Sequence, residues 1–286
     1  MEPIDLESSI VVILTALEEE YNAVREQLED IEEIEENSSI YEQGIFKVNG
    51  EPIAKVIIRE CGQRNDTAAM EAERAINKFS PIMIFFVGIA GSRKPGDFAV
   101  GDVIVGEKIY LYEGGKELRD SFRARPEAQG SSYKVVELAK SIRRNHEWKN
   151  LFKGGENIEN VKADKGIIAS GGKVIEHVDS HQGTILTMHY GDAHAVEMEG
   201  FGFASAMFRR EGREIYGVVR GISDVLEESP SDVEEQVASD SDLATQNRRP
   251  VTTKIFASRT AAAFTFQLVY KIVLAQKKSL NVPSHL

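Results

Sequence analysis

Three mainly apolar runs constrain the fold of this chain more than any other feature of its sequence. They are Ile10–Leu14 (IVVIL), Ile82–Val87 (IMIFFV) and Ile215–Ile222 (IYGVVRGI). Runs of this length, rich in β-branched and aromatic residues, are typical of strands that are buried on both faces. Segments with helical spacing lie between them, at Glu18–Leu28, Asn65–Phe79 and Tyr133–Asn145. This alternation predicts an α/β fold with a mixed, mostly buried sheet.

The remaining segments complete this expected architecture. Further strands are expected at Ile40–Val48 and Ile53–Cys61, joined by an Asn49-Gly50 turn, and at Gly101–Tyr112 and Gly166–Ala169. A short helix is expected between Lys173 and His181, and a closing amphipathic helix at Thr252–Ala275. Solvated or irregular segments are expected at Glu29–Glu36, Glu113–Gly130 and Trp148–Val161. No repeat or linker divides the chain, so we expect one domain over 1–286, with an N-terminal tail at 1–9.

Composition excludes several classes of function. The net charge of −12 argues against broad nucleic-acid binding, which requires a basic surface. No apolar run approaches the roughly 18 residues that span a membrane, and the acidic N-terminus is unlike a signal peptide. The single cysteine, Cys61, excludes an internal disulfide and fits a reducing compartment. We therefore expect a cytoplasmic protein with a small-molecule partner.

Carboxylates gather in the stretch Val196–Asp224. Glu197 and Glu199 flank Met198 ahead of a helix-like run, and the last apolar strand ends in Ser223 and Asp224. Open α/β sheets place their sites at the carboxyl ends of strands, and buried acids at such a point suggest chemistry. The alternative is a solvated helix start whose acids are stabilised by the helix dipole. The residues alone leave these two interpretations open.

The histidines raise the question of a metal site. His177 and His181 are four residues apart, with Asp179 between them, and His189 and His194 follow. Zinc could use such a set. There is no cysteine pair and no His-Glu-x-x-His motif, so we expect neither a metal nor a cofactor.

Four sequence motifs resemble those of the purine nucleoside phosphorylase/nucleosidase superfamily. They are Leu14–Val24 (LTALEEEYNAV), Val87–Gly91 (VGIAG) with Gly101–Glu113, Ile168–Ile175 (IASGGKVI), and Ala195–Ala204 (AVEMEGFGFA) with Val218–Asp224 (VVRGISD). The chain is most similar to the nucleosidase branch, which includes methylthioadenosine/S-adenosylhomocysteine nucleosidases. This resemblance implies a three-layer α-β-α fold with a central mixed, partly barrel-like sheet. It also implies a homo-oligomer, either a dimer or a hexamer.

The resemblance also assigns roles to individual residues. Asp224 would protonate the departing purine at N7, Glu199 would bind the ribose hydroxyls, and Glu20 would orient or deprotonate the attacking water. Arg220 would lie near that water, Met198 would pack against the sugar, and Glu197 would support its neighbours. The other residues implied to contact the substrate, mostly through their backbone, are Ile89, Ala90, Gly91, Val174, Ile175 and Ser223. A carboxylic acid that burial keeps neutral is suited to protonating a leaving group.

The segment after the first strand distinguishes hydrolysis from phosphorolysis. Phosphorylases of this superfamily carry a Gly-Asp-Pro-x-Arg loop there, whereas this chain has Thr15–Glu20 (TALEEE). Three carboxylates repel inorganic phosphate and favour water as the nucleophile. The sequence therefore predicts an N-glycosyl hydrolase.

Cations near the predicted site loops bear on the substrate. They are Lys173, Arg93, Lys94, Arg119, Arg123 and Arg125. Such cations could bind a polyphosphate, or they could pair with the nearby Asp97, Asp120 and Glu127. The chain is also similar to nucleosidase domains of bacterial antiphage defence proteins, which cleave ATP. This resemblance implies a purine nucleotide N-glycosidase that acts on ATP, dATP or a related adenine nucleotide. It also implies a role in antiphage defence through nucleotide depletion.

Two other functions remain open. One is a nucleosidase or phosphorylase of nucleoside salvage, and the other is a non-catalytic nucleotide sensor. Residues 225–250 follow Asp224 directly as a long polar segment, which we expect to act as a lid over the site.

Overall fold

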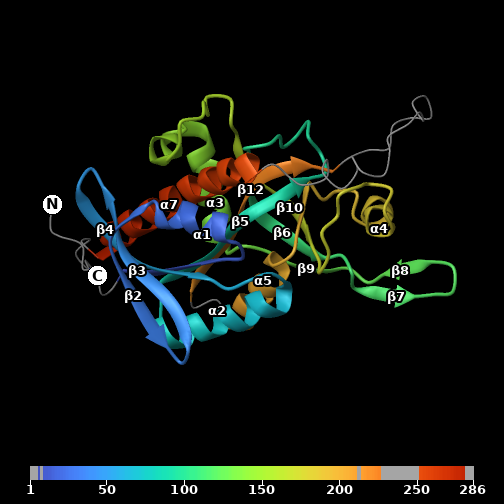
Figure 1. Ribbon diagram of the computed structural model, residues 1–286, viewed down its shortest axis with the longest axis horizontal. Coiled ribbons are helices and arrows are strands. Elements are labelled where there is room, and N and C mark those ends of the chain that lie inside the picture. Colours follow the sequence, from blue (N-terminus) through green and yellow to red (C-terminus); the bar gives the residue numbers. More distant parts are fainter. Residues whose placement is uncertain (1–5, 7–8, 211–213, 227–250, 281–286) are drawn as a thin grey trace, which may run out of the picture.

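The computed structural model describes residue 6 and the ranges 9–210, 214–226 and 251–280 (Figure 1). A ten-stranded mixed sheet forms its centre. The strands are β1 (Ile10–Thr15), β2 (Leu28–Glu36), β3 (Ser39–Val48), β4 (Glu51–Glu60), β5 (Met83–Ser92), β6 (Val103–Leu111), β9 (Glu127–Gln129), β10 (Ala163–Ser170), β11 (Ala195–Glu197) and β12 (Ile215–Val225). Their order is β11-β10-β6-β12-β5-β1-β4-β3-β2, and β9 pairs with β6.

One end of the sheet closes on itself. The short strand β11 pairs in parallel with β10 and antiparallel with β5, which completes a ring of β11, β10, β6, β12 and β5. The other strands, β1, β4, β3 and β2, extend from this ring as an open sheet (Figure 1). The prediction of a mixed, partly barrel-like sheet is therefore confirmed.

Helices cover both faces of the sheet. They are α1 (Glu18–Arg25), α2 (Asn65–Phe79), α3 (Tyr133–Asn145), the 3₁₀ helix η1 (Glu147–Leu151), α4 (His181–His189), α5 (Gly200–Arg209) and α7 (Val251–Leu280). Met83, Phe85 and Val87 of β5 pack into one core cluster with α1, α3 and α7, and Ile84 and Phe86 pack into another with α2 and α5. Successive residues of a strand point to opposite faces, so an unbroken apolar run lets β5 bury both. The result is the predicted three-layer α-β-α arrangement.

Two acidic or irregular segments are more ordered than their sequence indicates. Glu29–Glu36 belongs to β2, the outermost strand, and many of its glutamates face solvent. Charged side chains protect an exposed strand edge from pairing with other chains, so an acidic run is compatible with an edge strand. Glu113–Gly130 contains a hairpin of β7 (Gly115–Glu117) and β8 (Phe122–Ala124), followed by β9. The expectation of an irregular segment at Glu113–Gly130 is therefore wrong. For Glu29–Glu36 the solvated face is confirmed, and the alternative of a loop is wrong.

Other element boundaries also differ from the expectation. No helix lies between Lys173 and His181; α4 begins at His181, where Oγ of Ser180 caps it by accepting the N–H of Gly183. The glycine-rich segment after the Ile82–Val87 run continues β5 as far as Ser92. The first helix ends at Arg25, and Leu28 begins β2.

The predictions about a lid, a membrane span and a metal site can be compared only with the described ranges. Residues 227–250, which hold most of the proposed lid, lie outside them. Within the described ranges, no helix combines the length and apolar character needed to cross a membrane, and no group of three or more His, Cys, Asp or Glu side chains is arranged to hold a metal ion.

Candidate active site

A pocket of about 500 Å³ opens at the carboxyl ends of β1 and β5, beside β11 and the start of α5. Ten residues that the sequence singled out line it: Glu20, Ile89, Ala90, Gly91, Lys173, Val174, Ile175, Glu197, Met198 and Glu199. They come from segments that are far apart in the chain and meet because their strands are neighbours. The position agrees with the general rule for ligand sites in α/β folds.

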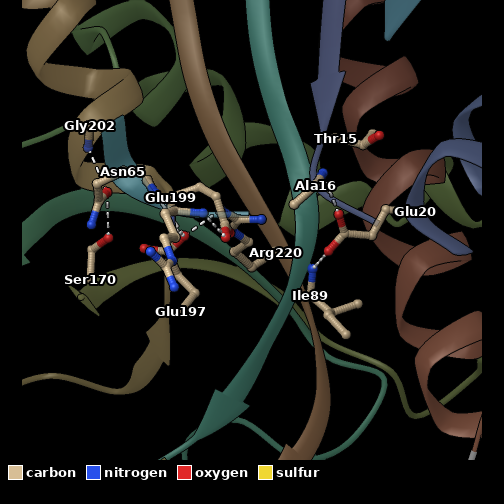
Figure 2. Close-up of polar contacts among 12 residues, drawn as sticks. Thr15, Ala16, Glu20, Asn65, Ile89, Ser170, Glu197, Glu199, Gly202 and Arg220 are labelled. Atoms are coloured by element: carbon tan, nitrogen blue, oxygen red, sulfur yellow. Dashed lines mark hydrogen bonds and ion pairs between the residues drawn. The ribbon is translucent and has the colours of Figure 1, made fainter. Parts of the chain in front are cut away.

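Glu20 is held rigidly at the first turn of α1. Its Oε2 accepts the backbone N–H groups of Ala16 (2.8 Å) and Leu17 (3.0 Å), and its Oε1 accepts the N–H of Ile89 (2.8 Å; Figure 2). The side chain therefore ties the turn after β1 to β5. Burial raises the pKa of Glu20, while Arg220 and the three N–H donors act in the opposite direction. A buried carboxylate with a raised pKa is suited to taking a proton.

A buried arginine joins the other two pocket glutamates. The Nη2 of Arg220, on β12, donates to Oε2 of Glu197 and lies 3.2 Å from Oε2 of Glu199 (Figure 2). Oε2 of Glu197 also accepts the N–H groups of Glu199 (3.0 Å) and Gly200 (2.8 Å), so it fixes the start of α5. This contact agrees with the supporting role that was expected of Glu197.

The cluster of Arg220, Glu20, Glu197 and Glu199 contains more acidic groups than basic ones. Arg220 is completely buried; burial favours its neutral form, but Glu197, Glu199 and Glu20 outweigh burial and raise its pKa. For Glu199, burial raises the pKa to about 7, with Arg220 opposing and Glu197 and Glu20 adding to the rise. One permanent cation thus faces three carboxylates, and Glu199 changes its charge near neutral pH.

Gly88 makes room for this arrangement. A Cβ added at this position of β5 would collide with Nη1 of Arg220 and would lie 2.5 Å from Oε1 of Glu20. The side chains of Arg220 and Glu20 therefore approach each other across the bare backbone of β5. This close approach explains why position 88 is a glycine, whereas the sequence alone suggested only a glycine-rich turn here.

A β-bulge places Asp224 next to the pocket lining, although Asp224 is not itself one of the lining residues. The register between β12 and β5 shifts between Ile222 and Asp224, which leaves Asp224 opposite Gly91. A Cβ on Gly91 would lie 3.1 Å from Oδ2 of Asp224, so the carboxylate sits against a residue that lines the pocket. The Oγ of Ser223 donates to Oδ1 of Asp224 at 2.5 Å. Bulges often re-aim a side chain beside an active site, and this one does so for Asp224.

The sequence did not predict a polar network that lies next to Glu199. Oδ1 of Asn65 accepts from Oγ of Ser170 (2.9 Å) and from the N–H of Gly202 (2.7 Å; Figure 2). It therefore joins the start of α2, the end of β10 and the first turn of α5. Arg64, which precedes Asn65, has a φ of 90° and donates its N–H to Oε1 of Glu199 (3.0 Å). A positive φ is strained for arginine, and strain of this kind is often found at functional sites.

Gly202 provided the one sequence signal for this network. A Cβ at Gly202 would collide with the backbone oxygen of Asn65. A glycine inside a helix costs stability relative to alanine, so its presence indicates a close packing contact. The sequence shows that such a contact exists, but it does not show the partner.

The predicted phosphate-binding cations are not gathered in one place. Lys173 borders the pocket, with its side chain 59% exposed and its Nζ 3.8 Å from Oε1 of Glu113. Nη1 of Arg93 donates to the carbonyls of Tyr190 (2.9 Å) and Ala193 (3.2 Å), and this arginine therefore holds the chain together locally. The pocket lining does not include the other four, Lys94, Arg119, Arg123 and Arg125. The last three belong to the β7–β8 hairpin or its flanks, and that hairpin projects from the body of the molecule (Figure 1).

Four lining residues were not anticipated. They are Gln63, Glu176, Val251 and Lys254. Lys254 lies in the first turn of α7, with its Nζ 3.9 Å from Oε1 of Glu19. No motif could have identified it, because α7 reaches the pocket only through its packing against α1 and β12.

This fold and pocket define a class of enzymes that act on nucleosides and related compounds. The model of the Phosphorylase superfamily matches residues 10–257, and the chain belongs to that family. A 5'-methylthioadenosine/S-adenosylhomocysteine nucleosidase from Maridesulfovibrio salexigens is 25% identical over 219 residues, which cover 77% of this chain and 87% of the relative. A nucleosidase of the same name from Exiguobacterium is 27% identical and covers 76% of this chain and 86% of its own.

Solved structures show the same fold. The corresponding nucleosidase of Neisseria meningitidis, bound to methylthio-immucillin-A, has a TM-score of 0.66 and 18% identity, over 92% of this chain and 99% of its own. Futalosine hydrolase of Helicobacter pylori has the same TM-score and identity, over 92% and 98%. The predicted superfamily and fold are thus confirmed. The prediction of an N-glycosyl hydrolase is confirmed at the level of its class, since these relatives are nucleosidases.

Proposed function

We propose that this protein hydrolyses the N-glycosidic bond of a purine nucleotide, with ATP or dATP as the preferred substrate, and releases the free base. The observation that carries the proposal is that Glu20 and Glu199 line one pocket and that Asp224 lies against Gly91, another residue of its lining. Three carboxylates in different surroundings can perform three different tasks.

The purine would leave at the Asp224 end of the pocket. Cleavage passes through a ribosyl cation, and negative charge develops on the departing base. A proton donated by Asp224 to N7 would neutralise that charge. Ser223, hydrogen-bonded to Oδ1, orients the carboxyl group, and Val174 and Ile175 offer backbone groups to the edge of the purine.

The ribose and the water would occupy the acidic side of the pocket. An ionised Glu199 accepts hydrogen bonds from the ribose hydroxyls, and Met198 packs against the sugar. Glu20 takes a proton from the attacking water, because three backbone N–H groups already fix its orientation. The positive charge of Arg220 lies between the two glutamates and balances the charge that develops there.

The structure supports water over phosphate as the nucleophile. Nη2 of Arg220 is engaged with Glu197 and Glu199, and the turn after β1 presents Glu20. Beside the proposed position of the water, an inorganic phosphate would be repelled by these three carboxylates.

The preference for a nucleotide rests on the two lysines that line the pocket, Lys173 and Lys254, and on the resemblance to nucleosidase domains of defence proteins. A role in nucleotide depletion during phage infection belongs to this proposal. The second candidate is a neutral nucleoside, which the names of the relatives favour, since they are nucleosidases of methylthioadenosine and S-adenosylhomocysteine. Self-association also stays a prediction, which analytical ultracentrifugation would test.

Chromatography of a substrate panel tests the proposal. Purified protein would be incubated with ATP, dATP, AMP, adenosine and methylthioadenosine, with and without phosphate, and free base would be measured. We expect adenine from ATP or dATP at the highest kcat/KM, with no dependence on phosphate. Adenine from methylthioadenosine but none from ATP would refute the nucleotide substrate. Tight ATP binding without turnover would support a sensor instead.

A further inference from the structure

The pocket lining includes a cation that no motif assigned. Lys173 and Lys254 are the lysines among the described lining residues, and they stand on different elements. Lys173 precedes Val174 and Ile175, so it stands beside the proposed purine. Lys254 comes from the first turn of α7, as Val251 does, and lies near Glu19 of α1. The two lysines therefore border different parts of a bound substrate.

Ribose stereochemistry connects Lys254 with the 5′ position. In the proposed complex the base points to Asp224 and the 2′ and 3′ hydroxyls point to Glu199. The C5′ atom is attached to C4′, across the ring oxygen from C1′, so its substituent leaves the ring away from the base. Leu17, Gln63, Val251 and Lys254 also line the pocket, and none of them is assigned to the base or to the hydroxyls. Lys254 is the one cation among these four.

The packing of α7 on α1 fixes the position of Lys254. Arg259, five residues further along α7, makes a two-pronged ion pair with Glu26, the residue that follows α1, with N–O distances of 3.0 and 2.8 Å. This pair is one of the contacts between α7 and the end of α1, and α1 is itself tied to β5 through Glu20. Lys254 is thus placed by the same framework that places the acid next to the attacking water.

Lys254 is held loosely enough to accept a ligand. Its Nζ lies 3.9 Å from Oε1 of Glu19, which is beyond hydrogen-bonding distance, and its side chain is 27% exposed. Lysine is a compact charge on a flexible stem and readily binds phosphate oxygens. A 5′-phosphate could replace Glu19 as its partner without any change in the backbone.

We infer that Lys254 is the residue that binds the 5′-phosphate of the substrate and selects nucleotides over nucleosides. This inference rests on the proposed function and adds the residue that distinguishes the two substrate classes. A neutral nucleoside has no group at this position for the ammonium to bind. The arginines of the β7–β8 hairpin are not needed for this step.

The test compares kcat/KM for ATP and adenosine in Lys254→Met. We expect a loss of about 10- to 100-fold for ATP, the effect of one charge-assisted hydrogen bond, and a change below about twofold for adenosine. Lys271→Met is the matched control, because Lys271 lies on the same helix with its Nζ 2.7 Å from Glu147, far from the pocket lining. Both values should stay at the wild-type level in the control. Lys254→Arg should restore most of the activity on ATP.

Other outcomes separate this inference from the proposed function. Equal losses on both substrates, or no loss on either, would overturn the role of Lys254 while ATP cleavage by the wild type still stands. A wild-type protein that releases no adenine from ATP would overturn the proposed function as well. Glu19→Gln gives a second readout if Lys254→Met does not fold, since removal of the competing carboxylate should lower KM for ATP. A raised KM in that variant would contradict the inference.

Discussion

The floor and the rim of the pocket are built in opposite ways. On the floor, Glu20 is 2%, Glu199 is 5% and Arg220 is 0% exposed. On the rim, the side chains of Lys173 and Lys254 are 59% and 27% exposed, and each lies nearly 4 Å from its carboxylate partner. Buried, hydrogen-bonded groups are fixed before the substrate arrives, whereas loosely paired groups can change partners. We propose that the floor determines the reaction and that the rim determines the substrate.

The largest effect is expected for the proton donor. Asp224→Asn should lower the rate of base release by about 10²- to 10⁴-fold, because the amide cannot donate an acidic proton to the purine. Adenine release by chromatography measures the effect, and thermal unfolding verifies that the variant is folded. Asp192→Asn is the control, since Asp192 is surface-exposed and accepts from Tyr110. Normal base release by Asp224→Asn would mean that another group protonates the base.

The next largest effect concerns the charge balance of the floor. Arg220→Met leaves Glu197 and Glu199 buried without their cation, and we expect it to lower the free energy of unfolding by about 3–5 kcal/mol. Arg259→Met removes the partly exposed pair with Glu26 and should cost about 0–1 kcal/mol. Urea denaturation of both variants measures the difference. Equal effects would show that burial does not distinguish the two arginines.

The pH dependence of activity follows from Glu199. Its pKa is raised to about 7, so the carboxylate becomes protonated as the pH falls below that value. We expect kcat/KM to decrease toward tenfold per pH unit on the acid side, and Glu199→Gln should lack this acid limb. A profile from pH 5 to 9 measures it. A wild-type profile that is flat across this interval would refute the assignment.

The same shift affects stability with a definite sign. A carboxyl group whose pKa is higher in the folded state binds its proton more tightly there. Its contribution to the free energy of unfolding is therefore greatest below its usual pKa of 4.5 and declines as the pH rises to about 7. In Glu199→Gln this part of the decline in the free energy of unfolding should be absent. Urea titrations at successive pH values measure it.

The smallest effect is expected at the exposed part of the rim. Lys173→Ala should change kcat/KM for ATP by less than about fivefold, because an exposed ion pair contributes at most about 1 kcal/mol. Steady-state kinetics on ATP and adenosine would measure it. A loss comparable to that expected for Lys254→Met would show that both sides of the rim bind the phosphates.

Much of the floor could be predicted because its residues follow buried strands. Glu20 comes just after β1, Met198 and Glu199 follow β11, and Asp224 lies at the end of β12. Their strands are recognisable as apolar runs, and neighbouring parallel strands bring their carboxyl ends together. The family resemblance then supplied roles that spacing alone left open.

The parts that escaped prediction depend on long-range packing. Asn65 joins Ser170 and Gly202, which are 105 and 137 residues away. The closure of the ring by β11 rests on a short antiparallel contact with β5 at Gly91 and Ser92. Lys254 reaches the pocket only because α7 packs along α1. Apart from the glycine at position 202, these contacts have no local signature, so a single sequence could not indicate the partners.

The most direct test of separate roles for the floor and the rim uses Glu199→Gln. It measures the ratio of kcat/KM for ATP to kcat/KM for adenosine in this variant. Because Glu199 binds the ribose that both substrates share, we predict that both values fall together and that the ratio stays within about twofold of the wild-type ratio. A ratio that shifts tenfold or more would show that the floor also selects the substrate, and would contradict the account.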